Sequence, residues 1–223
     1  MERILIELDS FHHVYNRGVD KRKIFDDDED RELFLTYLDV LNDCDIQSPR
    51  LKPELLERMK QSSRGKSLVN IIAFCLMSNH YHFLLQENNE GGISKFMQRL
   101  GTAYTMYYNQ KSERTGSLFQ GVYKSRLIDE ESHLLKVVDY IHLNPVTHKD
   151  GVGEKVISKS LLQELRNYRW SSFADYCGKN TYPRVLNLNA LSQYSEIPDA
   201  YDKWLLDEYR ADDFKDVEHL KID

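Results

Sequence analysis

The sequence is most strongly patterned over residues 68–86, LVNIIAFCLMSNHYHFLLQ. Residues 68–77 form a nearly unbroken apolar run, which is typical of a buried strand. The polar pair Ser78 and Asn79 interrupts this run, and a second group of strand-forming residues begins at His80. Two strands joined by so short a polar turn predict a β-hairpin, around which the other elements can be placed.

The elements on both sides of the hairpin follow a regular order. Their apolar spacing predicts strands over 11–17 and 117–128, and helices over 29–41, 92–110 and 130–143. The last helix is expected to stop before Pro145, because the residue before a proline disfavours helical backbone. The order strand–helix–strand–strand–helix–strand predicts an α+β, ferredoxin-like (RRM-like) fold, with helices on one face of an antiparallel sheet.

The 223 residues favour one core with an appendage. We expect a catalytic core over 1–146, with 43–67 as a loop or insertion, and a helical extension over 147–223 packed on it. No apolar run is long enough to span a membrane, and the start carries acidic residues instead of a signal peptide. Three cysteines lie far apart in the sequence, at positions 44, 75 and 177. They predict neither disulfides nor a zinc knuckle, so we expect a cytoplasmic protein.

The net charge of −6 hides an uneven distribution. Residues 26–45 hold nine acidic residues and one basic residue, and residues 196–223 hold ten acidic and four basic ones. Residues 95–127, in contrast, hold six basic residues and one acidic residue. A basic middle segment can steer a polyanion to one face, although uneven charge on a solvated surface explains the counts equally well.

Two histidines in the second strand of the hairpin are the first candidate site. His80 and His82 alternate with Tyr81, so both side chains point to the same face of the strand. Two imidazoles on one face can hold a divalent metal ion. A pair of histidines at this spacing also occurs in strands by chance, and that reading stays open.

A second candidate lies at the end of the predicted helix 130–143. Tyr140 and Asn144 are four residues apart and therefore share a helix face. Asn144 could instead cap the helix, and Tyr140 could be a core-edge aromatic. Taken with the two histidines, however, the four residues describe a chemistry. A metal held by His80, His82 and an amide oxygen polarises a phosphate, which the tyrosine hydroxyl attacks.

Six stretches of the sequence resemble the single-tyrosine HUH transposases of insertion sequences, most closely the REP-associated tyrosine transposases. They occur in family order between residues 12 and 176: HHVYNRG (12–18), AFCLMSNHYHFLL (73–85), ISKFMQRLGTAYTMYYN (93–109), TGSLFQGVYKS (115–125), YIHLNPV (140–146) and YRWSSFADY (168–176). The resemblance implies Tyr140 as the nucleophile, and His80, His82 and Asn144 as ligands of Mg²⁺ or Mn²⁺. It also implies cleavage of single-stranded DNA beside hairpins, with the 5′ phosphate kept on the tyrosine, by a monomer or a homodimer.

The sequence departs from the family pattern at three places. Tyr81 stands where the family usually has an aliphatic residue, and Val122 stands where many members have arginine. The segment 43–67 is longer than usual, and the family suggests no role for it.

Basic side chains at strand and helix positions are the candidate DNA contacts. They are Arg17, Lys95, Arg99, Lys124 and Arg126. Each can bind a phosphate, although an isolated surface lysine or arginine is more often simply solvated. Tyr104, Tyr107 and Tyr108 could stack on bases, or the first two could pack in the core.

Two other functions remain compatible with these residues. The chain could be a domesticated protein that binds DNA or RNA hairpins without cutting them. It could also be a metal phosphoesterase that uses water and needs no tyrosine. The presence of all four residues, His80, His82, Tyr140 and Asn144, favours the transposase.

Overall fold

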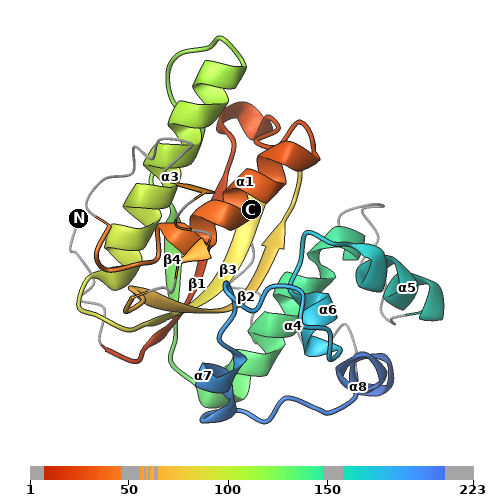
Figure 1. The fold of residues 1–223 in the computed structure, drawn as a ribbon. Coiled ribbons are helices and arrows are strands. Elements are labelled where there is room, and N and C mark those ends of the chain that lie inside the picture. The colour runs from red at the N-terminus through yellow and green to blue at the C-terminus, as the bar shows by residue number, and fades with distance from the viewer. Residues whose placement is uncertain are drawn as a thin grey trace.

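The computed structural model describes residues 8–46, 56–57, 59, 61–62, 65–147 and 158–208. At its centre lies a four-stranded antiparallel sheet in the order β2-β3-β1-β4 (Figure 1). The strands are β1 (Phe11–Arg17), β2 (Val69–Leu76), β3 (His80–Glu87) and β4 (Lys124–Ile128). Because helices connect β1 to β2 and β3 to β4, the predicted α+β ferredoxin-like class is confirmed, as is the β2–β3 hairpin.

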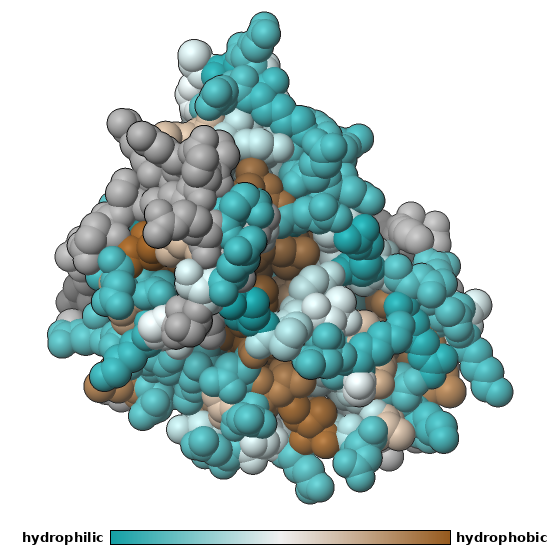
Figure 2. Space-filling model, viewed as in Figure 1, coloured by the Kyte–Doolittle hydropathy of each residue, from teal (hydrophilic) through white to brown (hydrophobic). Residues whose placement is uncertain are grey.

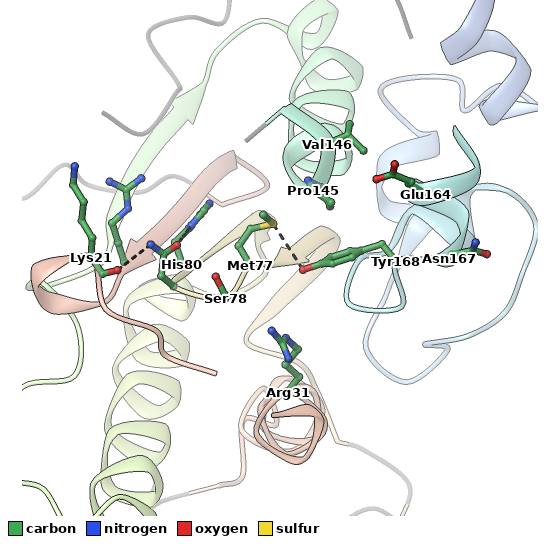
Figure 3. Close-up of a pocket in the computed structure, with 12 residues that line it drawn as sticks. Lys21, Arg31, Met77, Ser78, His80, Pro145, Val146, Glu164, Asn167 and Tyr168 are labelled. Atoms are coloured by element: carbon green, nitrogen blue, oxygen red, sulfur yellow. Dashed lines mark hydrogen bonds between the residues drawn. The ribbon is translucent and has the colours of Figure 1, made fainter. Parts of the chain in front are cut away.

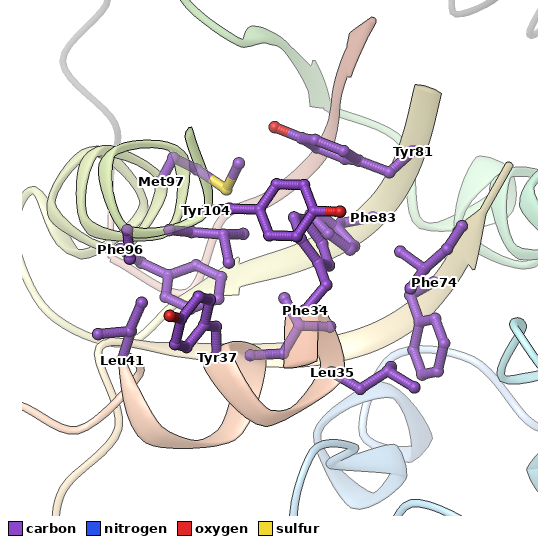
Figure 4. Close-up of a cluster of buried hydrophobic side chains, with 14 of the residues drawn as sticks. Phe34, Leu35, Tyr37, Leu41, Phe74, Tyr81, Phe83, Phe96, Met97 and Tyr104 are labelled. Atoms are coloured by element: carbon purple, nitrogen blue, oxygen red, sulfur yellow. The ribbon is translucent and has the colours of Figure 1, made fainter. Parts of the chain in front are cut away.

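One face of the sheet is covered by α1 (Asp28–Val40) and α3 (Gly92–Lys111). Aromatic side chains fill the space between the helices and the strands, as Figure 4 shows for Phe34, Phe83 and Tyr104. The ring centroids of Phe34 and Tyr104 lie 4.8 Å apart, edge to face, which is a favourable arrangement for aromatic pairs. This apolar layer packs against one face of the sheet. The other face is free to contact different helices.

The start of α3 is fixed by a glycine and a buried carboxylate. A Cβ atom on Gly92 would come within 2.3 Å of the carbonyl oxygen of Leu68, so the close approach requires glycine. The carboxylate of Glu87 accepts hydrogen bonds from the backbone N–H groups of Gly92 (2.7 Å) and Ile93 (2.9 Å). These contacts satisfy donors that a helix start leaves without intrahelical partners.

The opposite face of the sheet is covered by α4 (Glu131–Thr147). Its residues Leu134, Val138 and Ile141 are buried with Ile72 and Leu84 of the sheet. The prediction of helices on one face therefore holds for α1 and α3 and is wrong for α4. The physical reason is that the sheet carries apolar residues on both faces, and each face needs its own cover.

The C-terminal part of the chain packs beside α4 and along β2 (Figure 1). It comprises α5 (Lys159–Asn167), α6 (Phe173–Tyr176), α7 (Leu188–Ser192) and α8 (Tyr201–Glu208). Between α5 and α6 the chain pairs with the edge of β2, since Leu76 N–H donates to the carbonyl of Trp170 (2.8 Å) and Ser172 N–H to that of Phe74 (3.0 Å). The extension thus covers an edge that would otherwise expose backbone groups.

Two boundaries differ from the sequence predictions. The last strand begins at Lys124, and residues 117–123 are irregular. The last core helix continues through Pro145 to Thr147, because a proline in the final turn removes one hydrogen bond without ending the helix. Much of the predicted 43–67 insertion lies outside the described residues, as does 209–223 of the acidic C-terminal segment. The predicted boundary between 146 and 147 borders on such residues and stays a prediction.

The molecular face seen in Figure 2 is mostly hydrophilic, with apolar residues gathered in a band through its middle. None of the helices in the described ranges is long and apolar enough to cross a membrane.

Candidate active site

The candidate site lies on the sheet face that α4 covers. Side chains alternate along a strand, so the odd-numbered residues of β1 and the even-numbered residues of β3 share this face. The strand register places Arg17 opposite His80 and Tyr15 opposite His82. On the other side of β1, Tyr15 lies opposite Lys124. The antiparallel register therefore gathers aromatic, imidazole and basic groups beneath one helix.

The two predicted histidines lie side by side at the start of β3. Their ring centroids are 5.1 Å apart and the ring planes are nearly perpendicular. Both side chains are buried, His80 at 4% exposure and His82 at 0%. The amide oxygen of Asn144 lies 3.4 Å from Nε2 of His80, so α4 brings its asparagine to the first histidine. The structure thus brings together the three residues predicted to hold a metal.

Hydrogen bonds fix the orientation of His80 between two amide oxygens. The amide nitrogen of Asn79 donates to the carbonyl of Lys21 (3.1 Å), and that of Asn144 donates to the carbonyl of Tyr140 (2.9 Å). Each amide therefore turns its oxygen toward His80. Nδ1 of His80 lies 2.6 Å from the oxygen of Asn79, a distance at which its N–H donates.

A neutral imidazole that donates through Nδ1 has a lone pair at Nε2. In His80 this lone pair faces the amide oxygen of Asn144, another acceptor, at 3.4 Å. Two acceptors directed at each other suit a cation between them. With His82 alongside, the donor set is two imidazoles and one amide oxygen, which fits a borderline to hard divalent ion such as Mn²⁺ or Mg²⁺. Within the described ranges no group of three or more His, Cys, Asp or Glu side chains is arranged for a metal, so the amide is essential to this set.

Tyr140 lies on α4 against the same histidines. Its ring centroid is 5.4 Å from that of His82 and 5.6 Å from that of His13, both in edge-to-face contact. The side chain is half-buried, so its hydroxyl can meet a substrate that enters the site. The pair predicted from helical spacing, Tyr140 and Asn144, therefore faces the histidine pair.

A buried polar network holds α4 in this position. His142 lies between Tyr140 and Asn144 on α4. Its Nδ1 is 3.0 Å from the hydroxyl of Tyr201, and its Nε2 is 2.8 Å from that of Ser172. The Tyr201 hydroxyl also donates to the carboxylate of Asp139. Complete burial lowers the pKa of His142 to about 3, so the ring is neutral and acts as a structural connector. The network ties α4 to the C-terminal extension.

His13 belongs to the site and was not predicted. Its Nε2 lies 2.9 Å from Nδ1 of His82, and the two rings are nearly coplanar and edge to edge, with an interplanar angle of 7°. The sequence shows His12 and His13 side by side on a strand, but the strand register that sets His13 beside β3 is a long-range property. The neighbouring His12 points to the other face, where burial lowers its pKa to about 4.

The five predicted DNA contacts divide into two groups. Arg17, Lys124 and Arg126 lie on the site face: the Lys124 ammonium is 5.8 Å from the Tyr15 ring centroid, and Nε of Arg126 is 3.4 Å from the Tyr15 hydroxyl. Lys95 is exposed on α3, which covers the opposite face. The structure does not bring it to the histidines.

Arg99 is not a surface cation. Its side chain is buried and donates hydrogen bonds to the backbone carbonyls of Leu41 (3.2 Å), Asp43 (2.8 Å) and Ile46. Burial lowers the pKa of this guanidinium. Arg99 therefore fixes the chain after α1. The helical spacing that grouped it with Lys95 does not reveal this, because the carbonyls come from a distant loop.

The tyrosines of α3 pack beside α1, and their hydroxyls donate hydrogen bonds within the protein. The Tyr107 hydroxyl donates to Asp30 (2.9 Å), and the Tyr108 hydroxyl donates to Asp26 (2.8 Å). Burial and these carboxylates raise the pKa of each phenol to about 12. Tyr104 is fully buried and donates to the carbonyl of Ile24 (2.6 Å). The suggestion that these residues stack on bases is therefore not supported by their positions.

Comparisons with known proteins agree with this geometry. A family model described as "Transposase IS200 like" matches residues 13–144, which contain every residue of the site. The fold is similar to that of a solved structure entitled "Structure of the REP associates tyrosine transposase bound to a REP hairpin", with a TM-score of 0.51 and 13% sequence identity. The alignment covers 89% of this chain and 93% of that one. No curated protein matches the sequence.

Proposed function

Since the chain belongs to the family of IS200-like transposases, we propose that it is a metal-dependent single-stranded DNA endonuclease and strand transferase. It cuts beside DNA hairpins and forms a 5′-phosphotyrosine intermediate on Tyr140. The observation that carries the proposal is the convergence of Tyr140 and Asn144 of α4 on His80 and His82 of β3. The two pairs are separated by about 60 residues in the sequence, and only the fold brings their polar groups to one place.

The metal, Mg²⁺ or Mn²⁺, would be held by His80, His82 and the amide oxygen of Asn144. When bound, it supplies Lewis-acid polarisation of the scissile phosphate. The Tyr140 oxygen forms a bond to phosphorus as its proton is lost, and the bond from phosphorus to the 3′ oxygen breaks. The 3′ oxygen gains a proton and leaves as a hydroxyl. Attack by a 3′ hydroxyl on the phosphotyrosine reverses these steps, which gives strand transfer and restores the phenol.

The DNA partner is supported by the basic groups beside the site. Arg17, Lys124 and Arg126 lie on the same face of the sheet as His80 and His82. We expect them to bind backbone phosphates. The structural relative was solved with a REP hairpin, which makes hairpin DNA the first substrate to try. A monomer or a homodimer is compatible with the proposed function.

The decisive experiment is a search for a covalent adduct. The protein is incubated with a panel of hairpin-bearing oligonucleotides and Mn²⁺, and the products are separated in SDS. A DNA–protein band that is lost in the His80→Ala, His82→Ala double variant supports the proposal. Cleavage without an adduct would indicate a phosphoesterase that uses water, and tight binding without cleavage would indicate a domesticated hairpin-binding protein.

A further inference from the structure

A large cavity opens beside His80, between the ends of β1 and α4 and the C-terminal extension (Figure 3). Its volume is about 780 Å³, within the size range of small-ligand sites. The floor is the β2–β3 turn, residues 77–79, and one wall is the end of α4 at Pro145 and Val146. The cavity therefore begins where the proposed metal site ends, and a strand bound at His80 would continue into it.

One side of the cavity carries three cations from the first part of the chain, Arg17, Lys21 and Arg31. Arg17 also borders a smaller cavity of about 260 Å³ on the β4 side, which Lys124 lines. A phosphate backbone that crosses the site would thus meet Arg17 near the histidines, and then Lys21 and Arg31 in the large cavity.

Arg31 is unusual among these cations. It is the one basic residue of the acidic segment 26–45, yet its side chain is only 15% exposed. The guanidinium lies 5.5 Å from the ring centroids of both Phe25 and Trp170. One of its terminal nitrogens donates to the carbonyl of Asp27 (3.2 Å) and lies 3.5 Å from the exposed carboxylate of Asp28. Its Nε is buried, and no partner for it occurs among the described residues. The protein therefore holds a largely buried cation, packed between two aromatic rings, at the wall of the cavity.

The other side of the cavity comes from the C-terminal extension and has a different chemistry. Figure 3 shows Glu164 and Asn167 of α5 at this wall, and Tyr168 reaching toward Met77. The Tyr168 hydroxyl donates to the carbonyl of Leu76 (2.6 Å), which fixes the half-buried ring beside the sheet edge. An aromatic ring with a neighbouring amide and carboxylate suits a base, because the ring stacks and the polar groups meet base N–H donors.

From this arrangement we propose that the cavity binds the nucleotides of the single strand that flank the scissile phosphate. Their phosphates lie at Lys21 and Arg31, and a base lies at Tyr168 with its polar edge toward Asn167 and Glu164. The inference rests on the proposed function and goes beyond it. Five of the twelve lining residues come after 144, outside the family match, and three of them, Glu164, Asn167 and Tyr168, belong to the C-terminal extension. The extension therefore helps to select the cleavage site.

The first test measures binding and needs no cleavage. Fluorescein-labelled single-stranded dT oligonucleotides are titrated with the Tyr140→Phe protein in EDTA, followed by anisotropy at several salt concentrations. Adding Arg31→Gln should weaken binding about tenfold, as expected for the loss of one charged hydrogen bond. It should also reduce the log–log salt slope by about 0.7, the value for one phosphate of a single strand.

Arg169→Gln is the matched control. Arg169 also lies over Trp170, at 4.4 Å, but it pairs with Glu32 and does not line the cavity. It should bind as the parent does. Equal effects of the two variants, or no effect of Arg31→Gln, would overturn the subsite. If Arg31→Gln does not fold, Lys21→Gln removes an exposed cation at the same wall and must show the same loss of binding.

The second test locates the base. An oligonucleotide that contains 4-thiothymidine is cross-linked by light, and the modified peptide is identified by mass spectrometry. Cross-links to Tyr168 or Met77 support the proposal, whereas cross-links confined to Tyr15 or Gln120 would place the strand in the smaller cavity and refute it. An absent covalent adduct with normal Arg31 dependence would refute the proposed function alone. A normal adduct without Arg31 dependence would refute the subsite alone.

Discussion

Nε2 of His13 lies 2.9 Å from Nδ1 of His82, and the two buried rings are nearly coplanar. One of the two nitrogens must donate and the other must accept. If His82 offers Nε2 to a metal, its Nδ1 carries the proton, and His13 is the acceptor. This is the position that a carboxylate or a carbonyl holds behind many metal-binding histidines, where it fixes the tautomer and the ring orientation. We therefore regard His13 as a positioning residue.

Replacing His13 should weaken metal binding without removing a ligand. His13→Ala is expected to reduce Mn²⁺ affinity between about 10- and 100-fold, the usual effect of losing such a partner. His13→Gln should recover part of this loss, because its amide oxygen can accept from His82. Calorimetric titration with Mn²⁺ gives the affinities, and the nitrogen chemical shifts of His82 report its tautomer. The control is His12→Gln on the other face of β1; an equal loss in that variant would contradict the assignment.

Tyr140→Phe removes one oxygen and almost no volume. Folding, metal binding and DNA binding should all remain, while cleavage and the covalent adduct should vanish, because the nucleophilic oxygen is lost. Tyr15 also lies beside His82, but its side chain is buried. The competing phenols of Tyr107 and Tyr108 have pKa values raised to about 12 and donate to carboxylates. Mass spectrometry of the wild-type adduct is the check. A nucleotide on a tyrosine other than Tyr140 would show that the nucleophile is wrongly assigned.

Asn144→Ala should lower the affinity for the metal and leave the nucleophile in place. Activity at low Mn²⁺ is expected to fall, and part of it should return at high Mn²⁺. Asn144→Asp keeps an oxygen ligand but cannot donate to the carbonyl of Tyr140, so it should bind metal better than Asn144→Ala. Activity measured against Mn²⁺ concentration separates the two effects. If both variants lose activity equally at every concentration, the side chain has a role other than holding metal.

Arg99 and Lys124 should differ in what they support. Arg99→Met leaves the carbonyls of Leu41 and Asp43 without their donor and should lower the free energy of unfolding by about 3 kcal/mol. DNA affinity of the folded variant should be unchanged. Lys124→Ala should do the reverse, weakening DNA binding with a reduced salt slope and little change in stability. Denaturant unfolding and anisotropy give both numbers; a DNA-binding loss in folded Arg99→Met would restore the original prediction for that residue.

Stability should fall as the pH is lowered below neutrality. Burial lowers the pKa of His12 to about 4 and that of His142 to about 3, from the ordinary histidine value of about 6.5. Below pH 6.5 the unfolded chain binds protons at these positions and the folded chain does not, so the free energy of unfolding decreases. Each histidine contributes about 1 kcal/mol per pH unit between pH 6 and its folded pKa. Denaturant unfolding at pH 7, 6 and 5 should show this, and His12→Gln should reduce the slope.

The sequence by itself determined the local parts of this protein. Strand alternation placed His80 and His82 on one face of a strand. Helical spacing placed Tyr140 and Asn144 on one face of a helix. The hairpin and the order of core elements also followed from local periodicity. Such features depend on the direction of side chains along one element, which the backbone geometry of that element sets.

Only the tertiary structure decided which faces meet. Asn144 contacts His80 across 64 residues because α4 covers the second face of the sheet. His13 contacts His82 across 69 residues because the strand register sets β1 beside β3. The burial of Arg99 and the shape of the cavity beside His80 likewise depend on segments that are distant in sequence. The physical reason is that burial drives apolar faces together without regard to sequence distance, and polar groups carried on those faces become neighbours as a consequence.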